Sequence, residues 1–241
     1  MQETIEQQHQ QTRDNFRSWN ERMVAKHNPE AYHQKSHWLI QWIERRRVKA
    51  ILETVGKRME GKILEVGCGA GNVLEKTDYA KLVGIDLSVS MVRRTKERLK
   101  DKPVSVLQAN GEFLPFCEGS FDAIICTEVL EHVENPDRLL QEICRTAKPG
   151  ARIAISVPNE IFINRVKDSI LSLHLDHLLF RGGYSVPEHM EDEWHLHIFD
   201  LKTLHKKLSD VFDVEKVTAI PFSFFPIRYV FTCLPRNYRS A

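Results

Sequence analysis

The 241-residue sequence lacks several features that would assign it to a special class of protein. Its five cysteines (Cys68, Cys117, Cys126, Cys144 and Cys233) form no CxxC pair, so we expect reduced thiols and no disulfide scaffold. The net charge is only +1, and no basic excess points to nucleic acid. The first ten residues are polar and carry no apolar signal-peptide core. These absences together favour a cytoplasmic protein.

A membrane-spanning segment is also missing from the pattern. The most apolar stretch, residues 217–234, contains Pro221, Pro226 and Arg228, which a regular spanning helix would not tolerate. The composition, with 42% apolar and 28% charged residues, excludes a wholly disordered or fibrous chain. The length suits one α/β domain with elaborations.

Helical and strand-like patterns alternate along most of the chain. Residues 37–55 predict an amphipathic helix, on which Arg45, Arg46 and Arg47 are interpreted as a solvated face. Strands are expected at 62–66, 82–86, 104–108, 121–126, 151–157, 211–220 and 224–232, and helices at 88–100, 136–147 and 201–208. Pro149-Gly150 is expected to end the second of these helices. Strands separated by helices predict a parallel sheet with right-handed crossovers.

This alternation is interrupted after Pro158. Residues 159–198 have the character of an insertion with one apolar helix and a turn at Gly182-Gly183. Its apolar side chains favour ordinary packing onto the domain. The alternative interpretation is an apolar pocket or interfacial helix for a lipid-like acceptor.

The strongest motif is a predicted strand that ends in a glycine-rich loop, ILEVGCGAG at residues 63–71. Glycines let the backbone approach a ligand closely, and a helix expected after the loop would offer free N–H groups. Asp86 ends the next strand and can accept hydrogen bonds from both ribose hydroxyls of a nucleoside. Asp86 alone would be read as a helix cap, and the loop alone is a weak signal. Their combination predicts a nucleoside site.

Five sequence blocks resemble the class I S-adenosylmethionine-dependent methyltransferases, of the type 11 and ubiquinone-biosynthesis kind. They are ILEVGCGAG, GIDLS (84–88), ANGEFLPF (109–116), FDAIICTEVLEHV (121–133) and AKPGARIAISVPN (147–159). The resemblance implies an α/β Rossmann-like doubly wound sheet of about seven strands, the last one antiparallel. On this basis we expect an N-terminal helical segment or lid (1–60), a cofactor-binding core (61–160), a cap insertion (161–198) and a C-terminal part that completes the sheet (199–241).

The same resemblance implies S-adenosyl-L-methionine as the cofactor and gives roles to single residues. Asp86 would hold the ribose, and the backbone of Thr127 would lie near the sulfonium. Asn110 stands where the family usually has Asp, the residue that binds the adenine amino group, and an amide oxygen can still accept that hydrogen bond. The other expected cofactor contacts are Glu65, Gly67, Cys68, Gly69 and Gly71 around the methionine part, with Leu87, Leu114 and Gly111 around the adenine.

The block Glu128-Val-Leu-Glu131-His132 carries the candidate chemistry. Methyl transfer from a sulfonium is an in-line displacement in which the protein aligns donor and acceptor, and an acceptor such as a phenol also needs a base. On a helix, Glu128, Glu131 and His132 would share one face. EVLEH resembles ubiquinone-biosynthesis O-methyltransferases and small-RNA 3′-terminal 2′-O-methyltransferases, families in which the block can bind a divalent metal.

Two interpretations of this block follow from the resemblance. In one, Glu128, Glu131 and His132 are metal ligands, with the histidines of His195-Leu-His197 nearby. In the other, no metal is needed, Glu131 often supports local structure, and His132 lines the pocket as a base or acceptor-orienting residue. His132 and Glu131 are the candidate catalytic residues in either case.

The leading hypothesis is therefore O-methylation of a phenolic, quinone-like or lipid-linked small molecule, with peripheral membrane contact as a secondary expectation. A metal-dependent RNA 2′-O-methyltransferase is the first alternative, weakened by the near-zero net charge. An NAD-dependent oxidoreductase would explain the loop and Asp86, but the spacing is GxGxG, EVLEHV is unexplained and no YxxxK pair occurs. The last alternative is a non-catalytic binding protein of this fold, against which the intact loop and Asp86 argue. The oligomeric state stays open.

Overall fold

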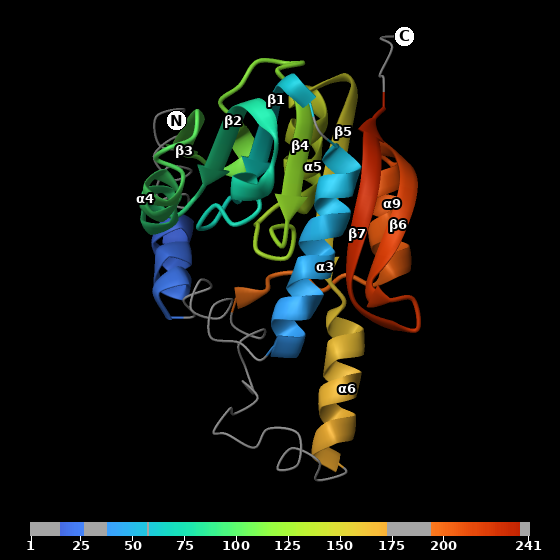
Figure 1. The fold of residues 1–241 in the computed structure, drawn as a ribbon. Coiled ribbons are helices and arrows are strands. Elements are labelled where there is room, and N and C mark those ends of the chain that lie inside the picture. The colour runs from blue at the N-terminus through green and yellow to red at the C-terminus, as the bar shows by residue number, and fades with distance from the viewer. Residues whose placement is uncertain (1–14, 27–37, 57, 173–193, 237–241) are drawn as a thin grey trace, which may run out of the picture.

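The computed structural model describes residues 15–26, 38–56, 58–172 and 194–236. A seven-stranded sheet lies at its centre, in the order β3-β2-β1-β4-β5-β7-β6 (Figure 1). The strands are β1 (Arg58–Val66), β2 (Tyr79–Asp86), β3 (Val104–Gln108), β4 (Phe121–Thr127), β5 (Ala147–Pro158), β6 (Phe212–Phe222) and β7 (Phe225–Pro235). β1 to β5 pair in parallel, whereas β7 is antiparallel to both β5 and β6. The predicted doubly wound sheet is confirmed.

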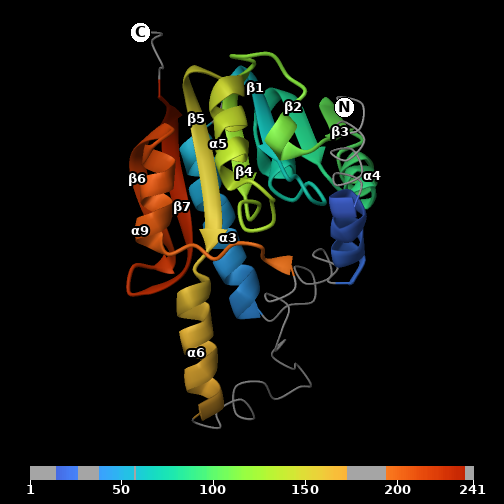
Figure 2. The same cartoon turned by 180° about the vertical axis from the view of Figure 1, so that it is seen from behind.

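Helices cover both faces of the sheet. They are α3 (Trp38–Val55), α4 (Val89–Arg98), α5 (Pro136–Thr146), α6 (Glu160–Ser172) and α9 (Leu201–Ser209), with single 3₁₀ turns η1 (Leu74–Lys76) and η2 (Gly111–Phe113). Figure 1 shows α3 crossing one face, and Figure 2 shows α5 and α9 on the other. A further helix spans residues 15–26 and lies beside α4.

The two hydrophobic cores follow the alternation of side chains along each strand. In β1, Leu64 and Val66 belong to the core under α5 and α9, whereas Ile63 belongs to the core under α3. In β4, Ile124 and Ile125 divide in the same way. Period-two alternation with apolar residues on both faces is what a sheet covered on both sides requires.

The strand order reverses beside β1, because β2 and β3 lie on one side of it and β4 on the other. At such a switch point the loops after the two central strands diverge and leave a crevice at the carboxyl end of the sheet. The glycine loop follows β1 and the EVLEH block follows β4. The fold therefore brings these two motifs together.

Three expectations about local structure are wrong. No regular helix follows the glycine loop; only η1 forms, because seven residues separate Gly71 from the start of β2 at Tyr79. Pro149-Gly150 does not end a helix, since α5 already ends at Thr146 and β5 begins at Ala147. The three arginines of α3 do not form one solvated face: Arg45 and Arg46 are exposed, but Arg47 is 6% exposed and reaches into the protein.

The insertion begins with α6, which confirms the apolar helix expected there. The Gly182-Gly183 turn lies outside the described residues. Among the helices in the described part of the chain, none combines the length and apolarity that crossing a bilayer needs.

Candidate active site

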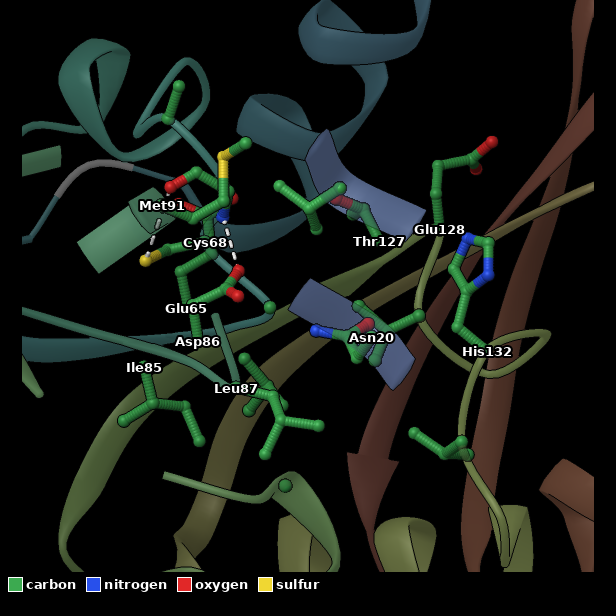
Figure 3. Close-up of a pocket in the computed structure, with 18 of the residues that line it drawn as sticks. Asn20, Glu65, Cys68, Ile85, Asp86, Leu87, Met91, Thr127, Glu128 and His132 are labelled. Carbon is green, nitrogen blue, oxygen red and sulfur yellow. Dashed lines mark hydrogen bonds between the residues drawn. The ribbon is translucent and has the colours of Figure 1, made fainter. Parts of the chain in front are cut away.

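A cavity of about 320 Å³ opens at the carboxyl ends of β1, β2 and β4 (Figure 3). The glycine loop and Asp86 form one end of it, and Thr127, Glu128 and His132 form the other. Its volume and mixed apolar and polar lining are those of a small-molecule site.

Asp86 ties the glycine loop to the second strand. Its Oδ2 accepts the backbone N–H of Gly69 at 2.8 Å, and its Oδ1 accepts that of Ser88 at 2.9 Å. Burial raises the pKa of Asp86 to about 6, although backbone hydrogen bonds from Ser88, Gly69 and Leu87 oppose the shift. A carboxylate has about four acceptor sites, so the group remains able to bind a diol.

Glu65 holds the loop from behind. It is 2% exposed, and its Oε2 accepts the N–H of Leu74 at 3.0 Å. Burial raises its pKa to about 8. This hydrogen bond fixes the segment that follows the glycine loop. No regular helix forms there to hold that segment in place.

The glycines of the loop differ in how closely other residues approach the position that a side chain would occupy. All three have positive φ, at 68° for Gly67, 50° for Gly69 and 79° for Gly71. A Cβ on Gly67 would lie 2.3 Å from Val129 Cγ2, so this glycine lets the two central loops touch. Gly71 packs against Thr95 of α4 and does not line the cavity. Gly69 faces open space, because a Cβ there would meet nothing within 4 Å.

The residues expected around an adenine are only partly at the cavity wall. Leu87, Asn110 and Gly111 line it, together with Ile85 and Met91. Asn110 Oδ1 accepts the N–H of Glu112 at 2.9 Å, so its Nδ2 group is the part of the amide left to donate. Leu114 is 5% exposed and packs in the core. Leu114 is not among the residues that line the cavity, so its expected place beside the adenine stays a prediction.

The EVLEH block forms a turn instead of a helix, which corrects the shared helix face expected for its polar residues. Glu128 has φ 56°, in the left-handed region that ends a regular helix, and α5 starts only at Pro136. Glu128 points to a different set of partners from Glu131 and His132. It accepts hydrogen bonds from Ser156 Oγ at 2.7 Å and from Arg228 Nε at 2.8 Å.

Glu128 belongs to a buried network of charges behind the cavity wall. Arg228 also contacts Glu44 at 3.0 Å, and Glu44 pairs with Arg47 at 2.8 Å. Burial alone would raise the pKa of Glu128, but the charges of Arg228 and Arg47 lower it below its ordinary value. Glu128 is thus an ionised member of a paired set, and the expected ligand set of Glu128, Glu131 and His132 is not brought together.

Glu131 and His132 instead meet His195, which follows the insertion. One ligand atom from each lies within 4.8 Å of the others. His132 Nδ1 lies 3.1 Å from the Trp194 carbonyl oxygen and can only donate to it, which leaves Nε2 with its lone pair. His195 Nδ1 lies 2.8 Å from Glu160 Oε1. His197 points elsewhere, with Nε2 2.9 Å from the Val133 carbonyl.

The electrostatics of this cluster favour neutral groups. Burial, and next the nearby His195, lower the pKa of His132 to about 4. Burial and the charge of Glu128 raise the pKa of Glu131 well above its ordinary value. Glu131 Oε2 is buried without a hydrogen-bond partner. His132 is therefore a neutral acceptor near pH 7.

Sequence patterns did not reveal the remaining wall of the cavity. Phe16, Asn20 and Val24 of the helix at 15–26 line it, as do Arg47, Trp194 and Arg228. Glu21 of the same helix accepts the N–H of Ser90 at 3.2 Å, which docks the helix on the start of α4. These residues lie outside the five blocks, and only the arginine run in α3 gave any signal.

Comparison with known proteins identifies the central part of the chain. Residues 64–155 match a family model described as a methyltransferase domain. The ubiquinone/menaquinone biosynthesis C-methyltransferase UbiE of Yersinia enterocolitica is 32% identical over 115 residues, which cover 43% of this chain and 45% of that protein. UbiE of Shewanella pealeana is 30% identical over 131 residues, covering 48% and 51%. Over residues 64–155 the chain is therefore similar to S-adenosylmethionine-dependent methyltransferases.

Solved structures agree with the fold of this methyltransferase domain. A methyltransferase from Methanosarcina mazei has a TM-score of 0.59 at 22% identity, covering 77% of this chain and 96% of that one. One from Mesorhizobium loti has a TM-score of 0.58 at 19% identity, covering 80% and 97%. The chain spans about half the length of the curated relatives it matches. The domain match leaves out α3 and β7, which supply Glu44, Arg47 and Arg228 to the site.

Proposed function

We propose that this chain transfers a methyl group from S-adenosylmethionine to a phenolic or quinol-like small molecule. The observation that carries the proposal is that one cavity joins two kinds of site. Asp86 and the glycine loop line one end, and His132, whose Nε2 keeps its lone pair, lines the other. The first end suits a nucleoside cofactor, and the second suits an acceptor that must lose a proton.

The residues present fit this cofactor. Asp86 offers a carboxylate to a ribose diol, Ile85, Leu87 and Met91 offer apolar contact to an adenine, and Asn110 offers an amide donor to a ring nitrogen. The cradle at Gly69 is open, since a Cβ there would project into empty space. When bound, the sulfonium supplies an already activated methyl group, so the chain has to orient the acceptor and exclude water.

His132 is the group that we propose takes the acceptor proton. Its Nδ1 is engaged by the Trp194 carbonyl, so Nε2 is available as an acceptor. Burial lowers its pKa to about 4, which keeps the imidazole neutral but makes it a weaker base than an ordinary histidine, so it acts by accepting a hydrogen bond from the hydroxyl as the proton begins to leave. A phenol has an ordinary pKa of about 10, and partial proton transfer raises the electron density on its oxygen and ortho carbon. The two UbiE relatives are named as C-methyltransferases, whereas the EVLEH block resembled O-methyltransferases. The same base would serve either atom, and the orientation of the ring would select between them.

Label transfer tests this proposal directly. The protein is incubated with methyl-labelled S-adenosylmethionine and an extract of its source cells, and the label is counted in organic, aqueous, nucleic-acid and protein fractions. We expect label in an organic-soluble ring compound and none with the Asp86→Ala variant. Label confined to the nucleic-acid fraction would contradict the proposed acceptor. Absence of transfer despite S-adenosylhomocysteine binding would favour the non-catalytic alternative.

A divalent metal at the same end of the cavity is a second candidate, favoured by one specific observation. Glu131 Oε2 is buried without a partner, and the cluster of Glu131, His132 and His195 places three ligand atoms within 4.8 Å of one another. The Trp194 carbonyl engages His132 Nδ1, a contact of the kind that orients metal-binding imidazoles, and His195 Nδ1 lies 2.8 Å from Glu160 Oε1 without a hydrogen bond between them. Two imidazoles and a carboxylate suit Zn²⁺, Fe²⁺ or Co²⁺.

Titration with Co²⁺ distinguishes the metal from the free-base mechanism. A metal site predicts visible ligand-field bands that disappear in His195→Ala, together with loss of label transfer on chelation. Unchanged spectra and chelator-resistant transfer would leave His132 acting as a free base.

A further inference from the structure

Large apolar side chains are exposed where three segments of the chain meet. Phe224, in the turn between β6 and β7, is 79% exposed, and Trp38 at the start of α3 is 67% exposed. Four others are at least 36% exposed: Leu39, Ile161, Phe222 and Phe225. We call these six residues the apolar rim.

Ring contacts join the rim to its supporting elements. Trp42 of α3 lies 5.6 Å from Phe222 between ring centroids, and Phe222 stacks on Phe224 at 5.1 Å. Phe162 of α6 packs edge-on against Phe225 at 4.9 Å. These ring contacts join α3 and α6 to the β6–β7 turn, so the three elements that carry the rim pack against one another.

The rim lies at the same end of the sheet as the cavity. Pro158, the last residue of β5, pairs with Arg228 three residues into β7, so the turn before β7 stands at the carboxyl end of β5. Figure 1 shows the β6–β7 turn, the start of α3 and the start of α6 at that end. A flat surface that docks on the rim would lie near the cavity mouth.

The exposed charges nearest the rim are arginines, and the first exposed carboxylate on α6 is Asp168, three residues beyond Arg165. The Arg46 guanidinium lies 5.2 Å from the ring centroids of both Trp42 and Phe222, and Arg45 and Arg165 are also exposed. In the described segments 38–46, 160–167 and 222–228, the only acidic residues are Glu44 and Glu160, which are 9% and 3% exposed and face inward. The rim thus combines aromatic rings and arginines without an exposed carboxylate.

We propose that the apolar rim docks on the surface of an anionic lipid bilayer. Aromatic rings favour the headgroup level of a membrane, and arginines attract anionic lipids while their stems lie along apolar surface. A second copy of the chain would bring the same arginines together, so the charge favours lipid. The proposal deepens the proposed function, because a membrane-dissolved ring compound would reach the cavity from the lipid.

Vesicle binding tests the rim without any turnover. The full chain is mixed with phosphatidylglycerol-containing vesicles or with pure phosphatidylcholine vesicles, and sedimentation is followed. Tryptophan emission is followed in a Trp19→Phe/Trp194→Phe background, so that only Trp38 and Trp42 contribute. We expect the chain to bind the anionic vesicles and its tryptophan emission to shift to the blue. Both effects should weaken as salt screens the arginines. Phe224→Asp should weaken binding about tenfold or more, because it removes a buried ring from the lipid.

Matched variants separate the rim from general stickiness. Leu107→Asp places the same charge on a 41% exposed residue of β3, at the opposite edge of the sheet, and should bind vesicles normally. Arg45→Glu should weaken binding to anionic vesicles without altering the rings. Failure of the wild-type chain to bind vesicles, or equal binding by Phe224→Asp, would overturn the proposal. If the wild-type chain formed dimers but did not bind vesicles, and Phe224→Asp abolished the dimers, the proposal would be overturned in favour of self-association. Label transfer is measured without vesicles, so its failure is separate from failure here.

Discussion

Arg228 Nε donates a hydrogen bond to Glu128 Oε2 across 2.8 Å, joining two residues that are 100 positions apart in the sequence. Arg228 also contacts Glu44 at 3.0 Å. Glu128 sits at φ 56°, a conformation that non-glycine residues adopt only when their surroundings hold them there. The turn that carries Glu131 and His132 is thus fixed by residues outside the matched methyltransferase domain.

Replacing Arg228 with methionine tests this support. The change removes the direct countercharge of buried Glu128 and leaves Glu44 with Arg47 alone, so we expect the free energy of unfolding to fall by roughly 3–5 kcal/mol in urea denaturation. Arg236→Met is the matched control, because its pair with Asp213 is exposed and should contribute at most about 1 kcal/mol. Equal losses in the two variants would show that the Arg228 network does not stabilise the turn.

The same network shows where sequence patterns stop being informative. The sheet, the glycine loop, Asp86 and His132 follow from local alternation and contiguous blocks, and the structure places them at the predicted edge. Arg47 was misassigned because a helix pattern does not say which arginine meets a buried glutamate from another element. Trp194 and the helix at 15–26 reach the cavity through tertiary packing that no local spacing records.

Alanine substitutions at Gly67 and Gly119 distinguish the cost of a steric clash from the cost of backbone strain. A Cβ at Gly67 would lie 2.3 Å from Val129 Cγ2 in addition to the cost of its positive φ. Gly119 also has positive φ, at 60°, but a Cβ there would meet nothing within 4 Å. We expect Gly119→Ala to cost about 1–2 kcal/mol of stability and Gly67→Ala clearly more, measured by thermal unfolding. Val129→Ala should recover part of the Gly67→Ala loss; absence of recovery would contradict the clash.

Glu65 should make the ligand-free protein less stable as pH rises. Its pKa is raised by burial to about 8 from an ordinary value of 4.5, so the folded state binds the proton more tightly than the unfolded state. The stabilisation is fully present below about pH 4.5 and is lost as pH rises through about 8. Urea unfolding across this range should show a fall of a few kcal/mol, on the order of the pKa difference. Glu65→Gln should flatten that profile; an unchanged slope would assign it to other groups.

His132→Asn should separate catalysis from cofactor binding. With the acceptor found by label transfer, we expect turnover to fall about 100-fold, because the base is lost, while S-adenosylhomocysteine affinity stays unchanged. In the wild-type chain at saturating cofactor, turnover should fall as pH drops toward about 4, where His132 gains a proton. His205→Asn changes an exposed histidine of α9 and is the control. Parallel losses of affinity and turnover would make His132 a structural residue.

Asp86 should make cofactor affinity fall as pH drops. Glu65, in contrast, should make the free energy of unfolding fall as pH rises. Its pKa is raised by burial to about 6, so the carboxylate that would hold a ribose diol gains a proton below that pH. Calorimetric titration with S-adenosylhomocysteine should show constant affinity above about pH 7 and weaker binding toward pH 5, because the protonated group loses one acceptor and its charge.

Asp86→Asn should bind at least about tenfold more weakly at pH 7 and lose the pH dependence. Asp213→Asn changes an exposed carboxylate of β6 and should match the wild-type chain. If Asp86→Asn kept the wild-type pH profile, the titrating group would lie elsewhere in the cavity, and the proposed ribose contact would be withdrawn.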